Sequence, residues 1–182
     1  MRKMKIQQTH KHSPIAFVEL LKACAMKKDL HEGARLHAHI LEHHGLLEKS
    51  PRIATTLISM YAKCGAITKA RQLFWELPVR DVVSWNALIA GYAQQGQPHE
   101  VFILFERMQK DRLSPDGVTF TCVLNACSSI GALDKGKEIH DEIVHRGLLE
   151  RNIMLGNALV DMYAKCGMFA KARSVLEELC IR

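Results

Sequence analysis

The sequence predicts an all-α protein, a right-handed α-solenoid of helix-turn-helix repeats with about ten helices. Two observations lead to this prediction. The string Tyr-Ala-Lys-Cys-Gly at residues 61–65 returns letter for letter at residues 163–167. That offset of about 102 residues is three units of about 34 residues, the length of one helix-turn-helix repeat. Apolar residues also recur at helical spacing, and no stretch alternates strongly with period two, so strands are not expected.

The segments between the two copies divide the chain further. Residues 117–127 match residues 14–24, and each match is followed by the pattern Gly-x-x-x-His and closes on Gly-Leu-Leu-Glu. We therefore expect one repeat domain, 14–182, after a basic flexible tail at residues 1–13. Its five repeats are 14–50 (long), 51–81 (short), 82–116 (standard), 117–152 (long) and 153–182 (short).

The standard repeat shows its two helices most clearly. Each helix carries one apolar stripe at i, i+3, i+4, i+7 spacing: Trp85, Leu88, Ile89 and Tyr92, then Val101, Leu104, Phe105 and Met108. Gly96 between them fits a left-handed helix C-terminus, and Pro98 fits the first turn of the second helix. All five prolines fall at repeat joints or helix starts, where they interrupt no stripe.

Composition gives the chain a basic character. The net charge of +6 indicates an anionic partner. Residues 1–13 are basic without an apolar run, so they are no secretory signal, and they are too short and too poor in Ser and Arg for a transit peptide. No segment approaches the roughly 20 apolar residues that span a membrane.

The cysteines do not form a recognisable metal or disulfide motif. Cys64 and Cys166 are equivalent positions of two short repeats, as Cys24 and Cys127 are of two long ones. Equivalent positions are whole repeats apart, too far to pair, and there is no C-x-x-C. We expect small buried thiols at helix ends.

A histidine cluster comprises His37, His39, His43 and His44. His39 and His43 have a spacing that could place two ligands on one helix face, but no acid or thiol completes a tetrahedral metal site. A solvated helix face is the favoured interpretation. The chain also lacks a deaminase zinc motif, a phosphate loop and a nucleophile elbow, so we expect no catalysis, no cofactor and no small-molecule substrate.

Residues 82–92, VVSWNALIAGY, together with Leu-Ser-Pro-Asp at 113–116, resemble a pentatricopeptide repeat. The alternation of Tyr-Ala-Lys-Cys-Gly repeats with Gly-x-x-x-His repeats is similar to the plant PLS subfamily, named for its standard, long and short repeats. The resemblance covers residues 14–182. It implies import into mitochondria or chloroplasts and binding of single-stranded RNA, commonly to specify cytidine-to-uridine editing sites with a separate deaminase or editing-complex protein as partner. The family's C-terminal extension and deaminase (DYW) domain are not in this sequence, so we expect a fragment or a truncated relative.

The resemblance further implies that each repeat reads one base with a first-helix residue and the last residue of the repeat. The pairs are Thr55 with Asp81 for guanine, Asn86 with Asp116 for uracil over cytosine, and Thr121 with Asn152 for adenine. With the N-terminus towards the RNA 5′ end, these repeats read G-U-A. Long repeats of the family follow the code poorly, which bears on the adenine assignment. Asn157 indicates a pyrimidine in the last repeat, whereas Val18 and Ser50 match no code.

Three residues are expected to hold the bases flat. Val83 and Val118, three positions before their readers, would clamp one base between them, and Arg52 would lay its guanidinium plane on another. The competing interpretation is that Asn86 and Asp116 are only helix-surface and cap residues. The alternative functions are a protein-binding helical-repeat scaffold and a basic assembly factor, both without base readout.

Overall fold

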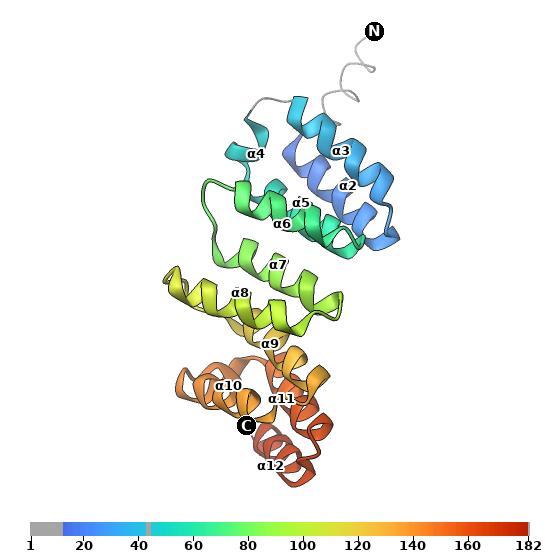
Figure 1. Cartoon of the computed structure of the whole chain (residues 1–182). Helices are drawn as coiled ribbons and strands as arrows, with labels where there is room; N and C mark the ends of the chain where they lie inside the picture. Colours follow the sequence, from blue (N-terminus) through green and yellow to red (C-terminus); the bar gives the residue numbers. More distant parts are fainter. Residues whose placement is uncertain (1–12, 43–44, 182) are drawn as a thin grey trace. The chain divides into compact units, whose positions relative to one another are not determined.

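A computed structural model describes residues 13–42 and 45–181, and in these residues it contains helices and no strand (Figure 1). Ten helices of 10 to 14 residues account for most of the described chain, joined by short turns. The prediction of an all-α chain with about ten helices is therefore confirmed. The helices fall into two compact parts, 1–91 and 92–182, each with its own packing.

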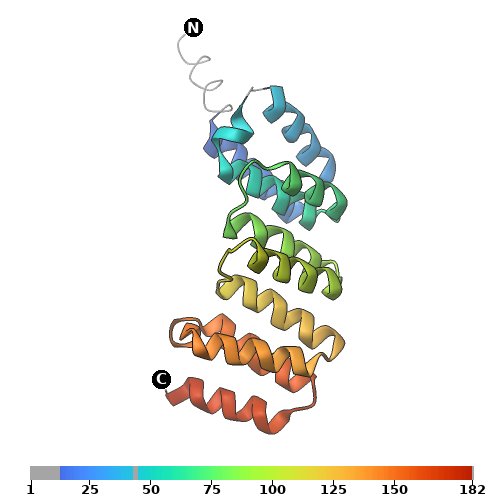
Figure 2. The same ribbon diagram turned by 60° about the vertical axis from the view of Figure 1, so that its left-hand side comes forward.

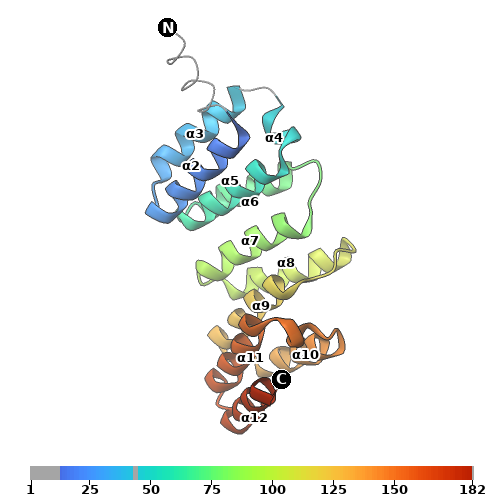
Figure 3. The same cartoon turned by 180° about the vertical axis from the view of Figure 1, so that it is seen from behind.

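The first part contains five long helices and one short one. In chain order they are α2 (Pro14–Lys27), α3 (Leu30–Glu42), α4 (Leu46–Lys49), α5 (Pro51–Lys63), α6 (Ile67–Glu76) and most of α7 (Val82–Gln94). Helix α5 packs against α2 on one side and against α6 on the other (Figure 3). Its side chains Ile53, Leu57 and Ile58 are fully buried there.

The second part repeats this arrangement. It contains α8 (Pro98–Lys110), α9 (Gly117–Ile130), α10 (Leu133–His145), the 3-10 helix η1 (Leu148–Arg151), α11 (Ile153–Lys165) and α12 (Phe169–Ile181). Helix α11 packs against α9 and α12, as α5 does against α2 and α6 (Figure 2, gold to red). Helices begin at Pro14, Pro51, Val82, Gly117 and Ile153, while the division into five repeats and their types stays a prediction.

The Gly-x-x-x-His pattern of the long repeats has a packing origin. Helix α3 approaches α5 so closely that a Cβ on Gly33 would overlap the Met60 sulfur, and a Cβ on Gly136 of α10 would overlap that of Met162 in the same way. One helical turn after each glycine, a histidine on the same face reaches the neighbouring helix. Each glycine therefore serves the contact between the helices rather than a turn, since a side chain there would have to displace the methionine.

The positions of the histidines differ in part from the solvated helix face that was expected. His37 is only 6% exposed, and its Nδ1 lies 3.0 Å from the Tyr61 hydroxyl, so the solvated-face interpretation is wrong for it. His140 and Tyr163 form the same pair at 2.8 Å. His39 packs edge-on against the Phe17 ring. His43 and His44 lie outside the described residues.

The thiols follow the expectation in part. Cys24 and Cys127 are buried within α2 and α9, whereas Cys64 and Cys166 are half-buried C-caps of α5 and α11. The Cys64 thiol lies 3.8 Å from the Cys24 carbonyl oxygen. All cysteines whose side chains are described are reduced.

One long repeat carries a strained helix end that the other avoids. Lys28 caps α2 with φ 55°, in the left-handed region, and the equivalent residue after α9 is Gly131 with φ 67°. A side chain costs energy in this conformation. Lys28→Gly is therefore expected to raise the free energy of unfolding by about 0.5–1 kcal/mol in urea denaturation, net of glycine's extra freedom in the unfolded chain. The matched variant Gly131→Lys should lower it; equal stabilities would show that neither cap is strained.

Candidate nucleic-acid interface

The first short repeat, residues 51–81 and hereafter simply the short repeat, brings its two predicted readers into one pocket. Thr55 on α5 and Asp81, just before α7, both line an open pocket of about 150 Å³, together with Pro51 and Ser84. Asp81 is held by a reciprocal cap: its Oδ1 accepts from the Ser84 N–H at 2.8 Å, and its own N–H donates to the Ser84 hydroxyl at 3.0 Å. The carboxylate is exposed, so it can serve as cap and as acceptor for a ligand.

The threonine readers share one local geometry. The Thr55 hydroxyl donates to the Pro51 carbonyl at 2.9 Å, and the Thr121 hydroxyl donates to the Gly117 carbonyl at 2.7 Å. A hydroxyl has a single proton. Since that proton is committed to the helix backbone, each threonine presents oxygen lone pairs, and hence an acceptor, to whatever lies beside it.

The second long repeat also brings its two readers together, through Gly117. Thr121 bonds the Gly117 carbonyl, while the Asn152 side-chain amide lies against the Gly117 Cα. Asn152 caps α11, its Oδ1 accepting from the Leu155 N–H at 3.1 Å. This bond fixes the amide orientation, so that Oδ1 faces α11 and Nδ2 faces Gly117.

The readers of the standard repeat lie in different compact parts, so their pairing stays a prediction. Asn86 on α7 is only 7% exposed, which excludes the interpretation that it is a simple helix-surface residue. Asp116 is the N-cap of α9: its Oδ1 accepts from the Val118 and Thr119 N–H groups, both at 3.0 Å, and Thr119 completes a capping box. Asp116 therefore has the cap role of the competing interpretation, which does not prevent it from contacting a base.

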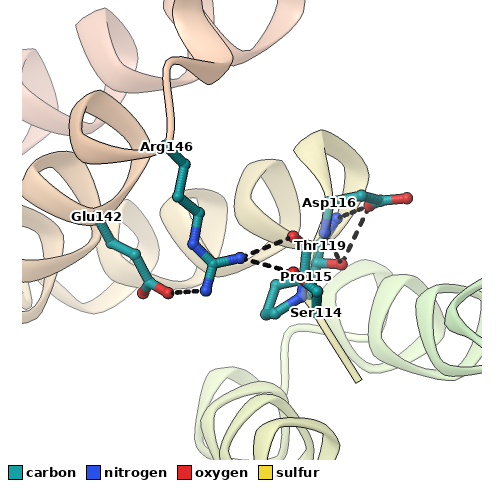
Figure 4. A network of polar contacts seen from close by, with 6 residues as sticks. All are labelled: Ser114, Pro115, Asp116, Thr119, Glu142 and Arg146. Carbon is teal, nitrogen blue, oxygen red and sulfur yellow. Dashed lines mark hydrogen bonds and ion pairs between the residues drawn. The ribbon is translucent and has the colours of Figure 1, made fainter. Parts of the chain in front are cut away.

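A polar network fixes the joint that carries Asp116 (Figure 4). Arg146, following α10, donates to the Ser114 hydroxyl at 2.9 Å and to the Pro115 carbonyl at 3.3 Å, and it forms an ion pair with Glu142. Its guanidinium also lies 5.5 Å from the centre of the Phe120 ring. The two residues before Asp116 are thus tied to the second helix of the following repeat, which limits the positions available to the carboxylate.

Exposed apolar side chains recur at one helical position. Val83 and Val118, the predicted clamps, are 61% and 55% exposed; Ile15 and Met154, three residues before Val18 and Asn157, are 75% and 73% exposed. Single exposed apolar residues are ordinary, but recurrence at one position is not. In the short repeat Arg52 takes this place and is exposed. Asn157 is exposed on α11 next to Met154.

Cys122, next to Thr121 in the sequence, adds no charge to this surface near pH 7. Burial, and to a smaller extent the Asp116 carboxylate, raises the pKa of Cys122 to about 11, so it stays neutral near pH 7. Among the described residues, no three His, Cys, Asp or Glu side chains come close enough to hold a metal ion. Within the same residues, every helix is too short or too polar to cross a membrane.

These repeats match family models. The model described as PPR repeat family matches residues 80–129, and the PPR repeat model matches residues 53–82, 118–148 and 157–181. Together they cover more than half of the chain. The chain therefore belongs to the pentatricopeptide repeat (PPR) family.

Similar proteins come from plants. The pentatricopeptide repeat-containing protein At2g13600 of Arabidopsis thaliana is 37% identical over 92% of this chain and 24% of its own length. The mitochondrial protein OGR1 of Oryza sativa subsp. japonica is 39% identical over 87% of this chain and 28% of its own length. The chloroplastic Arabidopsis protein At4g18520 is 36% identical over 88% and 25%. The chain thus spans about a quarter of the length of these relatives.

Solved structures support the same fold. Maize PPR10 matches with a TM-score of 0.65 and 25% identity over 94% of this chain and 25% of that one. The PPR domain of Arabidopsis thaliana protein-only RNase P 1, solved in complex with tRNA, matches with a TM-score of 0.66 and 16% identity over 90% and 88%. At that identity the second match speaks for the helical-repeat fold alone.

Sequence reasoning missed the contributions of four residues: Ile15, Met154, Gly117 and Arg146. Ile15 and Met154 could have been found by applying the three-residue offset of Val83 and Val118 to every repeat. The contact of Gly117 with Asn152 had no sequence signal, because nothing in the local pattern says which side chain a glycine faces. The bonds from Arg146 cross more than 30 residues, beyond any helical periodicity.

Proposed function

We propose that this chain binds single-stranded RNA and reads one base per repeat, as a segment of an RNA-processing specificity factor. The main support is the commitment of both threonine hydroxyl protons to the backbone, which makes each threonine an acceptor. The terminal readers Asp81 and Asn152 then make the two pairs chemically distinct. PPR10 has been solved in complex with an 18-nucleotide psaJ RNA element, although at 18% identity that complex supports the fold rather than the contacts. Exposed Ile15 and Val83 in the first part, and Val118 and Met154 in the second, supply apolar surfaces for flat bases.

For the short repeat we propose guanine. Thr55 presents an acceptor, and Asp81 presents a carboxylate in the same pocket. Guanine is the base whose Watson–Crick edge carries two adjacent donors, the ring N1–H and the exocyclic amine. Two acceptors facing two donors pair both of those donors, whereas adenine would place its N1 acceptor against an acceptor.

For the second long repeat we propose adenine. Thr121 again presents an acceptor, but Asn152 has its oxygen occupied by Leu155 and offers its amide N–H₂. Adenine carries a donor, the N6 amine, beside an acceptor, N1. A protein acceptor next to a protein donor therefore fits adenine, whereas opposite the two adjacent donors of guanine the Asn152 amide N–H₂ would meet a donor.

For the standard repeat we propose uracil, read by Asn86 with Asp116. An amide side chain both donates and accepts, as the alternating edge of uracil requires. The burial of Asn86 restricts its rotation, and a restricted amide discriminates better than a mobile one. With Asn157 as a further pyrimidine reader, the central segment of the target is G-U-A followed by a pyrimidine.

Salt-titrated binding tests the proposal. Fluorescence anisotropy compares an RNA containing G-U-A with a scrambled RNA of the same composition at increasing KCl. Three complete reader pairs support roughly micromolar binding, because contacts of about 1–3 kcal/mol must offset the entropy of association. Base readout predicts that a preference persists at high salt. Equal, salt-sensitive binding of both RNAs would indicate a basic factor without readout, and no binding would favour a protein-binding scaffold.

Asn86→Thr is expected to shift the preferred base of the standard repeat from uracil towards guanine. In the proposed pair with Asp116, the threonine would present an acceptor together with an acid, which is the combination of Thr55 with Asp81. The shift should be about 1 kcal/mol in relative affinity, since one neutral hydrogen bond is exchanged. Competition binding with RNAs that differ only at this base measures it. Val83→Ala, as control, should weaken all bases alike; an unchanged preference in Asn86→Thr would mean that Asn86 is not a reader.

We further propose that the chain acts in mitochondria or chloroplasts, where several of its relatives are named as located. Its role there would be to select an RNA processing or cytidine-to-uridine editing site, with the chemistry supplied by a separate deaminase or editing-complex protein. The absence of a recognisable catalytic motif in the sequence supports a non-catalytic role. Import of the full-length protein fused to a fluorescent protein, and loss of editing at G-U-A-containing sites in a knockout plant, test this assignment.

A further inference from the structure

Gly117 is the first residue of the second long repeat, a position that Pro14, Pro51, Val82 and Ile153 take in the other repeats. It begins α9, its carbonyl accepts the Thr121 hydroxyl, and its Cα lies under the Asn152 amide. A Cβ built on Gly117 would overlap Asn152 Nδ2 and come within 3.4 Å of its Cγ. The space that holds this amide therefore exists only because residue 117 has no side chain.

The close approach is not explained by backbone conformation. The φ of Gly117 lies outside the left-handed region that favours glycine, so another residue could adopt the same backbone. The neighbours of the glycine are the readers Thr121 and Asn152 rather than core residues. The absent side chain thus matters for the position of the amide and not for the turn or the fold.

The short repeat provides the contrast. Four positions before the reader Thr55 lies Pro51, as Gly117 lies four positions before Thr121. The carbonyl of each accepts a hydrogen bond from the threonine hydroxyl. Pro51 has a ring where Gly117 has no side chain. Asp81 lines the same pocket as that ring, whereas Asn152 lies on the bare Cα of Gly117. The two repeats therefore share the threonine geometry but differ in the surface below the terminal reader.

We propose that Gly117 is a positioning residue that sets base specificity in this repeat, an inference that rests on the proposed RNA readout. The Leu155 N–H fixes which end of the Asn152 amide points towards α11, and the bare Cα of Gly117 allows the amide to lie against the residue whose carbonyl holds the Thr121 hydroxyl. Acceptor and donor are thereby both held at Gly117, and adenine requires one of each. A side chain at residue 117 would displace the donor and leave the Thr121 acceptor in place.

The test is Gly117→Ala in the full chain. Competition anisotropy uses RNAs that differ only at the base assigned to this repeat, and again RNAs that differ only at the base assigned to Thr55 and Asp81. The adenine-over-guanine preference should fall several-fold in Gly117→Ala, while the guanine preference of the short repeat stays unchanged. Asn152→Asp, which converts the pair to two acceptors, should instead favour guanine.

An RNA-free measurement separates this inference from the proposed function. The side-chain ¹⁵N–¹H₂ signals of Asn152, assigned by their loss in Asn152→Asp, should shift in Gly117→Ala while the backbone signals of α12 stay in place. Unshifted side-chain signals, or an unchanged adenine preference, would overturn the positioning role. Shifted signals in a chain without base preference would support the positioning contact and overturn the proposed RNA readout.

Discussion

Trp85→Ala is expected to lower the free energy of unfolding by about 3–5 kcal/mol, the cost of removing a large aromatic side chain from a core. Trp85 is fully buried, and its ring centre lies 4.7 Å from that of Phe74 and 5.9 Å from that of Trp75, both edge-on. It therefore anchors the first turns of α7 onto α6. A loss of this size is a large fraction of the stability of an ordinary domain.

Urea denaturation followed by far-UV circular dichroism measures the change without relying on the removed fluorophore. Trp75→Ala is the matched control, because Trp75 is half-buried and touches the same rings; its loss should be clearly smaller. Trp85→Phe should recover much of the stability, since the buried Trp85 Nε1 makes no hydrogen bond with the described residues. If Trp85→Ala is no worse than Trp75→Ala, the ring cluster does not stabilise α7.

Trp85 also connects the core to the proposed readout. Asn86 follows it directly, so the packing that fixes Trp85 also fixes where the Asn86 amide points. A variant that loosens α7 should therefore reduce the discrimination between uracil and guanine before it abolishes RNA binding. This order of loss would distinguish damage to one repeat from general unfolding.

Periodicity was enough to predict the fold. The stripe of Trp85, Leu88 and Ile89 predicted a buried helix face, and these side chains are fully buried. Gly96 was expected in a left-handed C-terminal position and has φ 66°. Such features depend on residues within one or two helical turns, which is the range over which sequence spacing carries information.

Side-chain contacts were less predictable, both within a repeat and between helices. The cap role of Asp81 and the occupied hydroxyl of Thr55 depend on atoms three or four residues away, yet the sequence does not say which rotamer a threonine adopts. His37 was misread because a histidine on a polar-looking helix can be buried by a neighbouring repeat. Its recurrence at His140, opposite a recurring tyrosine, was the available signal.

The two histidine–tyrosine pairs predict a loss of stability in mild acid. Burial is the largest cause that lowers the pKa of His37 and of His140 below the ordinary value, and Lys69 and Lys171 lower them further, against smaller opposite effects of nearby acids. An unfolded histidine has a pKa of about 6.5. Between that value and the folded pKa, the unfolded chain binds more protons, so stability falls as the pH drops below about 6.5 and through the folded pKa values.

The structure gives a reason why protonation of His37 is costly. Its Nδ1 is paired with the Tyr61 hydroxyl, whereas its Nε2 is buried and makes no hydrogen bond with the described residues. A charged imidazole would carry an N–H on both nitrogens, and the one on Nε2 would have no acceptor. Protonation should therefore loosen the contact of α3 with α5.

Urea midpoints at pH 7.5 and pH 5 test this in the wild type and in the double variant His37→Gln with His140→Gln. At pH 7.5 each substitution should cost about 1–3 kcal/mol, because a buried tyrosine hydroxyl loses its partner. The wild type should lose more stability than the variant on moving to pH 5, since glutamine cannot take up a proton; carboxylates that titrate in this range are common to both. Parallel losses would show that these histidines do not set the acid sensitivity, whereas a flatter variant would place it at the contacts where each long repeat packs on the short repeat that follows.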